Sequence, residues 1–283
     1  MTPRSNDMPK NKTIRRGALN RALRVSLAGA RAGGVFAIDG ALKRLRGDEA
    51  GDEARLDRAA RRFAQQLGTL KGSYVKIGQL FALLGEHFLP APLTRALHAL
   101  EAENEALPWA EMEPHFRAAL GAQFGDLDIE TEALAAASLA QVHRARIKST
   151  GHEVVLKAQY PELAAVLDDD FNAVVRMLRL ARWIPASRDF DSWLTILHEQ
   201  LHAELDYPRE QAMALAFASA LDHHPHLTET QVALTVPQYW QAYCGAQVLT
   251  LDYVKGHRAG SAAVAALSQS TRNALGRLML QLF

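Results

Sequence analysis

The stretch from Glu132 to Pro161 reads EALAAASLAQVHRARIKSTGHEVVLKAQYP and decides the fold. It opens with a loop of small residues, Ala135, Ala136, Ala137 and Ser138. An alternating strand is predicted from Leu139 to Ile147, a turn from Lys148 to His152, and a second strand from Val154 to Ala158. Two apolar, β-branched runs joined by a glycine-containing turn predict a β-hairpin.

A single lysine, Lys157, lies inside the second, apolar strand. Burying an ammonium group is costly unless it meets an anion or a carboxylate. In kinase-type nucleotide sites a small-residue loop covers the phosphates and a strand lysine pairs with them. The alternative is an ordinary hairpin whose lysine points to solvent at a sheet edge, because V-x-x-K strings are common. Lys157 alone leaves both interpretations open.

Length, cysteine content and hydropathy limit the number of domains and the cellular compartment that the chain fits. The 283 residues suffice for one large or two modest domains. The only cysteine, Cys244, excludes an internal disulfide framework and a thiol-based metal cluster, which fits a reducing compartment. No apolar run is long enough to span a bilayer, and no apolar signal core begins the chain. We therefore expect a cytoplasmic protein.

The N-terminal segment, residues 1–50, is basic. Its first 47 residues hold eleven Lys or Arg and two Asp, a net charge of +9. Residues 1–13 are polar and expected to be disordered. From Ile14 to Arg46 the pattern is compatible with a helix lying peripherally on an anionic membrane surface. The alternative, a helix packed on the protein with a solvated basic face, is slightly favoured, because Gly29, Gly33 and Gly34 interrupt the apolar periodicity.

After a predicted linker at residues 48–54, one long helix is expected from Leu56 to Leu84. It contains Lys76 and Gln79, which share a helical face because they are three residues apart. Gly78 between them lets another group approach the helix closely. The two polar side chains could reach a pocket on another domain, or form a solvated stripe. Two shorter helices are expected before residue 121.

Two further helices are predicted after the hairpin, from Glu162 to Trp183 and from Phe190 to Ala220. The second contains Glu204, Asp206 and Glu210, with Pro208 marking a break or a new first turn. Acidic residues near a helix start are favoured by the helix dipole, so a purely structural role is available. In kinases, however, a helix glutamate pairs with the strand lysine. Glu210, placed well inside the expected helix, is the better candidate.

The last third of the chain contains a histidine-rich turn, two strands and a helix. The turn holds His223, His224 and His226, and an exposed turn is favoured over a metal site because no convergent carboxylate or thiol is evident. Strands are expected at Val232–Tyr239 and Val248–Val254. The second runs into Gly256 like the hinge between two kinase lobes. A helix with a leucine face is expected from Ser261 to Phe283.

These motifs together resemble the AarF/UbiB family of atypical protein-kinase-like proteins. The resemblance rests on KIGQ, on AAAS followed by LAQVHRA, on the lysine strand before QYP, on ELD, and on LTLDYVKG, and covers roughly residues 60–283. It implies an α+β fold: a kinase-like N-lobe, with a small antiparallel sheet plus helices, and a helical N-terminal extension. The implied parts are a basic segment (1–50), the KIGQ extension (51–125), the N-lobe (126–256) and the start of a C-lobe (257–283).

The resemblance also implies a site that binds ATP or ADP with Mg²⁺. Lys157 would hold the α- and β-phosphates, Glu210 would orient it, and Lys76 and Gln79 would enter from the extension. The residues implied for catalysis are Lys157, Glu210, Lys76, Gln79, Glu204 and Asp206, and those for nucleotide binding are Ala135, Ala136, Ala137, Ser138, Lys157, Asp252 and Val254. Asp252 departs from the family, where a glutamate is expected at the hinge.

Two classes of function follow. The first is the N-terminal portion of an ATP-dependent kinase or ATPase linked to ubiquinone or other isoprenoid-lipid metabolism; the second is a non-catalytic nucleotide- or lipid-binding regulatory module. Beyond Asp252 the chain contains no Asp or Glu. Kinase metal ligands and the catalytic base follow the hinge, so we expect a fragment that is inactive by itself. The expected partners are nucleotide and isoprenoid lipid or quinone-biosynthesis proteins, and no nucleic acid is expected.

Overall fold

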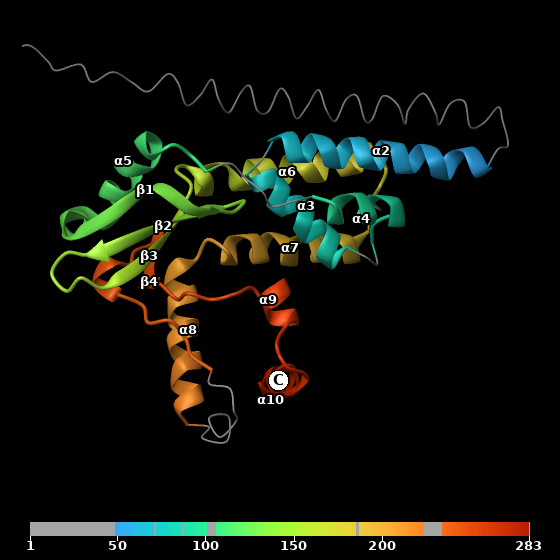
Figure 1. The fold of residues 1–283 in the computed structure, drawn as a ribbon. Coiled ribbons are helices and arrows are strands. Elements are labelled where there is room, and N and C mark those ends of the chain that lie inside the picture. The colour runs from blue at the N-terminus through green and yellow to red at the C-terminus, as the bar shows by residue number, and fades with distance from the viewer. Residues whose placement is uncertain are drawn as a thin grey trace, which may run out of the picture. The chain divides into compact units, whose positions relative to one another are not determined.

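The computed structural model describes residues 49–70, 72–85, 88–100, 106–184, 187–223 and 234–282. They form two compact units, and Figure 1 labels the helices and strands of both. Unit 1 comprises Met1–Asn104, Ala137–Leu139 and Glu162–Leu201, and unit 2 comprises Glu105–Ala136, Ala140–Pro161 and His202–Phe283. The predictions for the basic N-terminus, for His224 and His226, and for the start of the Val232–Tyr239 strand lie outside the described residues.

Unit 1 is helical. It contains α2 (Glu49–Leu70), α3 (Ser73–Leu84), α4 (Ala91–His98), α6 (Leu163–Leu180) and most of α7 (Arg188–Ala203). Helices α2, α3 and α4 pack on one another, and α3 also packs on α6. Aromatic rings fill the core: the Phe81 ring meets Trp193 edge-on at 5.4 Å between centroids and lies 6.1 Å from Phe171. This packing fixes α3, the helix that carries the KIGQ motif.

The predicted long helix from Leu56 to Leu84 is wrong, because it is two helices. Gly72, between α2 and α3, has a φ of +59°, a left-handed conformation that a helix cannot continue through. The predicted linker at residues 48–54 is also wrong, since α2 begins at Glu49. The start of α3 is held by a buried hydrogen bond in which the Ser73 hydroxyl donates to the Asp170 carboxylate of α6.

Unit 2 is built on a four-stranded antiparallel sheet in the order β1-β2-β3-β4. The strands are β1 (Leu127–Ala136), β2 (Ala140–Ile147), β3 (Glu153–Gln159) and β4 (Val248–Asp252). The α+β class and the β2–β3 hairpin are therefore confirmed. Strand β1 continues through Ala135 and Ala136, which pair with Val142 and Gln141, so only half of the predicted small-residue loop lies outside a strand.

The described part of unit 2 also contains four helices, of which one precedes β1, one lies between β3 and β4 in the chain, and two follow β4. They are α5 (Trp109–Leu120), α8 (Tyr207–Asp222), α9 (Ala262–Ala265) and α10 (Gln269–Gln281), with 3₁₀ turns η1 (Gly121–Asp126) and η3 (Gln241–Tyr243). Helix α5 and β2–β4 share a core around Phe116, Leu156 and Val248. Burying these side chains holds β3, the strand of Lys157, in the middle of the sheet.

Three element predictions in this region need correction. The helix predicted from Phe190 to Ala220 is divided into α7 and α8, with Pro208 in the first turn of α8, so the new-turn alternative is the right one. Residues 234–238 form no regular strand, and Tyr239 makes only an isolated bridge to Leu251. The helix predicted from Ser261 is interrupted, because the Ser268 hydroxyl caps the start of α10 by accepting from the Thr271 N–H.

The QVH part of the motif is buried and structural. The Gln141 side chain accepts from the Leu107 N–H at 2.8 Å and donates to the Leu107 carbonyl at 3.4 Å. It also lies 2.7 Å from His143 Nε2, and His143 Nδ1 lies 2.8 Å from the Glu130 carbonyl oxygen. The His143 ring packs against Trp109 and Phe116. These contacts fasten β1, β2 and the segment before α5 together.

We expect the free energy of unfolding to decrease in mild acid. Burial lowers the pKa of both His115 and His143 below the ordinary 6.5, outweighing hydrogen bonds to the Gln159 and Glu130 backbones. A lowered folded-state pKa means that the unfolded chain binds more protons, so stability is full above pH 6.5 and is lost as the pH falls below it. Urea unfolding of the full chain at pH 7.5, 6.5 and 5.5 measures this dependence.

His143→Gln is expected to flatten that pH dependence, whereas the control His257→Gln, at an exposed position, is expected to leave it unchanged. An equal dependence in the wild type and His143→Gln would show that His143 does not titrate on unfolding.

In the part of the chain that the structure describes, no helix is both long and apolar enough to cross a membrane.

Candidate nucleotide site

The lysine of β3 and the first turn of α8 meet in unit 2. Lys157 Nζ donates to both carboxylate oxygens of Glu210, at 2.9 and 2.8 Å. The two side chains are 34% and 38% exposed, so the pair is open on one side. Lys157 lies opposite Val142 and Leu249 in the sheet, which makes β3 an internal strand and excludes the edge-strand alternative. The ammonium group therefore has a carboxylate partner and remains accessible to a second anion.

Tyr207 forms a third side of this arrangement and is a residue that sequence reasoning misses. Its side chain is 1% exposed, and Lys157 Nζ lies 4.9 Å from its ring centroid. Burial raises the pKa of Tyr207, and the nearby carboxylates of Glu210 and Glu204 raise it further, so the phenol stays neutral. The ring supports the lysine through a cation–π contact. In the sequence, a tyrosine between ELD and PRE reads as an ordinary core residue.

The ELD turn joins α7 to α8. Asp206 is the N-cap of α8, and its carboxylate accepts from the Arg209 N–H at 3.0 Å. Gln159, at the end of β3, donates from its amide to the Leu205 carbonyl at 2.6 Å. The turn is thus tied to the lysine strand, and Glu210 falls in the first turn of α8 rather than deep inside a helix. Sequence reasoning does not identify Gln159, although this residue is the first of the QYP motif.

The small-residue connection between β1 and β2 is short. Ala137, Ser138 and Leu139 make this connection and belong by their contacts to unit 1. Ser138 is buried at 6% exposure. The predicted phosphate-covering role of Ala135, Ala136, Ala137 and Ser138 stays a prediction.

At the predicted hinge, the Asp252 carboxylate is occupied by side chains of unit 2. It accepts from Trp240 Nε1 at 2.9 Å and lies 3.0 Å from His152 Nε2. Burial raises the pKa of Asp252, but the hydrogen bonds from Trp240, His152 and the Gln238 backbone lower it more, so the net shift is downward. Beyond it, Val254 is 62% exposed in a segment without regular structure. Any adenine contact here would use backbone groups, and the nucleotide roles of Asp252 and Val254 stay predictions.

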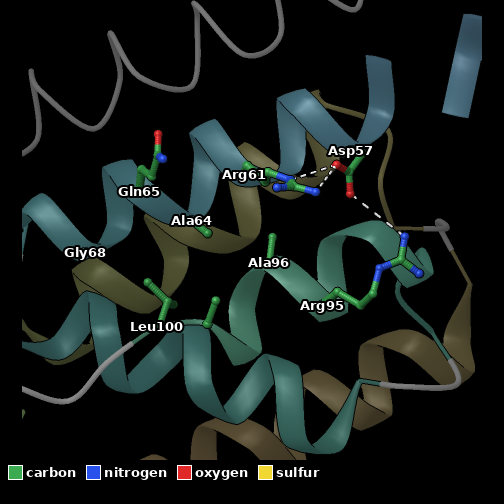
Figure 2. Close-up of a pocket in the computed structure, with 9 residues that line it drawn as sticks. Asp57, Arg61, Ala64, Gln65, Gly68, Arg95, Ala96 and Leu100 are labelled. Atoms are coloured by element: carbon green, nitrogen blue, oxygen red, sulfur yellow. Dashed lines mark hydrogen bonds and ion pairs between the residues drawn. The ribbon is translucent and has the colours of Figure 1, made fainter. Parts of the chain in front are cut away.

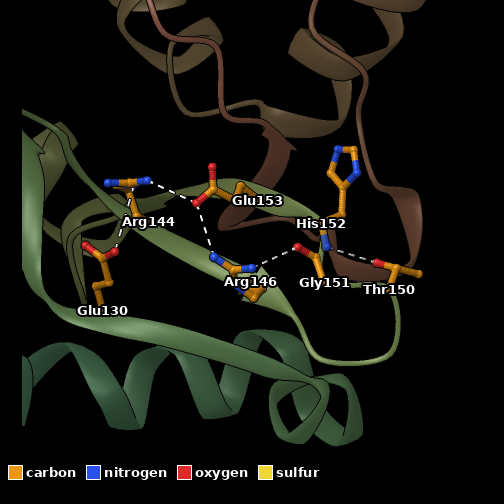
Figure 3. A network of polar contacts seen from close by, with 7 residues as sticks. All are labelled: Glu130, Arg144, Arg146, Thr150, Gly151, His152 and Glu153. Atoms are coloured by element: carbon orange, nitrogen blue, oxygen red, sulfur yellow. Dashed lines mark hydrogen bonds and ion pairs between the residues drawn. The ribbon is translucent and has the colours of Figure 1, made fainter.

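A polar network braces the β2–β3 hairpin (Figure 3). Arg144 and Arg146 of β2 both reach the Glu153 carboxylate of β3, at 3.3 and 3.4 Å. The Arg144 guanidinium also lies 4.3 Å from the Tyr253 ring centroid, just after β4. Exposed ion pairs of this kind contribute at most about 1 kcal/mol each. These ion pairs join β2 to β3, and the Arg144–Tyr253 contact joins β2 to the residue that follows β4.

Lys76 and Gln79 lie on one face of α3 in unit 1, as their spacing predicts. With Leu97, His98 and Leu100 they line a cavity of about 300 Å³. Gln79 Nε2 donates to the Leu100 carbonyl at 3.1 Å. The space left by Gly78 is filled by the same leucine, since a Cβ there would lie 2.5 Å from Leu100 Cδ1. Entry of Lys76 and Gln79 into the nucleotide pocket stays a prediction.

A four-stranded antiparallel sheet whose internal strand lysine pairs with a helix glutamate defines the N-lobe of a kinase-like protein. A family model described as "ABC1 atypical kinase-like domain" matches residues 99–283. The chain belongs to this family, which confirms the resemblance to AarF/UbiB proteins.

Curated relatives carry the same assignment. The chain is 29% identical over 249 residues to "Atypical kinase COQ8, mitochondrial" of Schizosaccharomyces pombe, covering 87% of this chain and 39% of that protein. It is 31% identical over 200 residues to "Probable protein kinase UbiB" of Serratia proteamaculans, covering 68% and 34%. The chain thus spans between a third and two fifths of these relatives. A solved structure of Rv3197 with erythromycin, from Mycobacterium tuberculosis, matches at 26% identity and a TM-score of 0.49, covering 82% of this chain and 56% of that one.

Proposed function

We propose that this chain is the nucleotide-binding N-terminal portion of an ATP-dependent atypical kinase or ATPase of the COQ8/UbiB type. The observation that carries the proposal is the two-oxygen contact between Lys157 and Glu210 in the middle of the sheet. This pair is the part of a kinase site that positions the α- and β-phosphates. Its remaining exposure leaves the ammonium group room for a phosphate oxygen.

Within this proposal, the chain's own residues bind and orient the nucleotide. Lys157 would donate to phosphate oxygens while Glu210 keeps the ammonium group in place, and Tyr207 would close the apolar side. Backbone groups after Asp252 would meet the base. The proposed links to ubiquinone or isoprenoid-lipid metabolism, and the proposed partners among quinone-biosynthesis proteins, rest on the resemblance to the AarF/UbiB family, and relatives such as COQ8 fit them.

Mg²⁺, when bound, would neutralise charge on the β- and γ-phosphates. Residues 253–283 contain no Asp or Glu that could hold it. Upstream, Asp206 caps α8 and Glu210 holds Lys157. This observation favours the second candidate function for the chain by itself, a module that binds nucleotide without turning it over. Ligands for the metal would be supplied by residues outside the segment 253–283.

The 283-residue chain is therefore expected to bind ATP or ADP weakly and not to hydrolyse ATP. Electrostatic positioning by metal ions is nearly the whole of phosphoryl-transfer catalysis, and residues 253–283 offer no carboxylate to hold such an ion. Titration calorimetry with ADP and with a non-hydrolysable ATP analogue measures binding, and phosphate release measures turnover. The matched control is Lys148→Ala, which removes an exposed lysine from the turn of the same hairpin.

Binding that Lys157→Ala abolishes and Lys148→Ala preserves supports the proposal. Hydrolysis that disappears in Lys157→Ala would contradict the expected inactivity, and Glu204 and Asp206 would then be the carboxylates to replace next. Equal binding by all three proteins would reject the site itself.

A further inference from the structure

A second cavity lies in unit 1, between α2 and α4 (Figure 2). Its volume is about 540 Å³, within the range of small-molecule sites in proteins. The residues of the KIGQ face line a separate cavity, and Lys157 and Glu210 belong to unit 2. The cavity is therefore unused by the proposed nucleotide function.

The mouth of this cavity is cationic. Arg61 Nε donates to Asp57 at 2.7 Å, and an Arg95 terminal nitrogen lies 3.9 Å from the other oxygen of the same carboxylate. Two guanidinium groups therefore share one carboxylate, which leaves a net charge of +1. The arginine side chains are 69% and 62% exposed. Each guanidinium has five N–H donors in a planar fork that suits a phosphate or carboxylate.

The floor of the cavity is apolar and narrow. Ala64 of α2 and Ala96 of α4 face the space between the two helices, and Gly68 leaves it open toward Leu100 (Figure 2). A Cβ at Gly68 would lie 3.6 Å from Leu100 Cδ2. Small side chains along both helices leave room for an alkyl chain, whereas the charged groups stand at the mouth. The charged side chains of the lining thus lie together, and Gln65 is an uncharged polar side chain beside the alanines.

We propose that this cavity binds a small amphiphilic organic anion. Its phosphate or carboxylate group would take hydrogen bonds from Arg61 and Arg95, and its alkyl chain would lie over the alanine floor and end at Leu100. The anionic head group compensates the positive charge of the mouth, and burial of the apolar chain adds a contribution that inorganic phosphate lacks. The same head group occurs on membrane lipids, but a cavity of about 540 Å³ suits a single free molecule, which is the ligand that we propose.

The position of Leu100 gives the ligand a route to the KIGQ motif. The leucine side chain that closes this cavity occupies the space left by Gly78, and its carbonyl accepts from Gln79. A chain pressing on Leu100 would therefore act on the two residues of α3 that hold it. Bound ligand should slow hydrogen exchange in α3, because the leucine could no longer move out of its groove.

Titration calorimetry of the full chain with octyl phosphate, below its micelle concentration, tests the proposal. We expect saturable binding of one molecule per chain, at least about tenfold tighter than inorganic phosphate or octanol. The double variant Arg61→Gln/Arg95→Gln should bind at least about tenfold more weakly. Ala99→Phe, at an exposed position of the cavity lining, should do the same by filling it. The control Arg58→Gln, exposed on α2 and outside the lining, should stay within about twofold of wild type.

The proposal is overturned if octyl phosphate binds no more tightly than inorganic phosphate, or if the double variant binds as wild type does. Binding only to vesicles of phosphatidic acid and phosphatidylcholine would also overturn it, because a lipid surface would then be the partner. Lys157→Ala should leave octyl phosphate binding unchanged, so the failure of one site is separable from the failure of the other. Circular dichroism of each variant confirms that the helices are retained.

Discussion

Replacing Lys157 with alanine is expected to weaken nucleotide binding by at least about tenfold, because a charge-assisted hydrogen bond to phosphate contributes about 1.5–3 kcal/mol. Glu210→Ala should weaken it less, since that change leaves the lysine present but no longer held by its two contacts at 2.8 and 2.9 Å. Both variants and the double variant are measured by calorimetry with ADP.

The double-mutant cycle should give a coupling free energy of about 1 kcal/mol. The pair is about a third exposed, so solvent screening keeps the value below that of a fully buried ion pair. Additive effects of the two single changes would show that Glu210 does not position Lys157 for the ligand. Lys148→Ala controls for the loss of one positive charge from the hairpin.

Gln141→Leu is expected to destabilise the sheet unit by about 2 kcal/mol without altering its ligand chemistry. The change keeps the volume of the side chain but leaves the Leu107 N–H and carbonyl without the partner they have in the wild type. Each buried polar group left unsatisfied costs about 1–3 kcal/mol. Hydrogen exchange of β2 amides in the full chain, read by mass spectrometry, reports this loss within unit 2.

The matched control is Gln238→Leu, which changes a glutamine of the same unit whose backbone, rather than its side chain, bonds to Asp252. It should leave the exchange of β2 close to that of wild type. If Gln141→Leu instead abolished nucleotide binding while β2 exchanged normally, the QVH motif would belong to the site and not to the scaffold.

The hairpin was accessible from sequence because its pattern is local. Apolar residues recur at Ala140, Val142, Ala145 and Ile147, the turn contains a glycine, and the second strand is apolar around one lysine. Strand β1 lacks such a signal: its solvent face holds Glu130 and Glu132, and its pairing is interrupted by register shifts. Only pairing with β2, together with the Glu130 carbonyl near His143, reveals it as a strand.

Helix breaks were harder to predict than helices. Gly72 reads as a tolerated glycine within a long apolar pattern, and the pattern gives no sign of its positive φ. The break before α8 does carry a local signal, since Asp206 stands two residues before Pro208 as an N-cap would. The N-cap and proline pattern therefore predicts that Glu210 lies in the first turn of α8, near the helix start.

Some residues of the candidate site could be predicted from the sequence, and others could not. Lys157 and Glu210 were identified by combining the cost of a strand lysine with the resemblance to kinases, and the structure brings them together. Tyr207 was missed because a buried aromatic residue has no sequence signal that separates a core side chain from one beneath a lysine. The relation of Lys76 and Gln79 to that lysine depends on how two units are arranged, which no local pattern encodes.

The most direct measurement of the central claim is labelling with an acyl-phosphate derivative of ATP, which transfers its acyl group to a lysine amine lying beside the phosphates. After digestion, mass spectrometry identifies each modified lysine in the full chain. We expect Lys157 to be acylated and excess ADP to suppress this modification, while labelling of Lys148 is weak and insensitive to ADP. Modification of Lys148 or Lys76 in place of Lys157, or labelling of Lys157 that ADP does not suppress, would contradict a phosphate site at the β3 lysine.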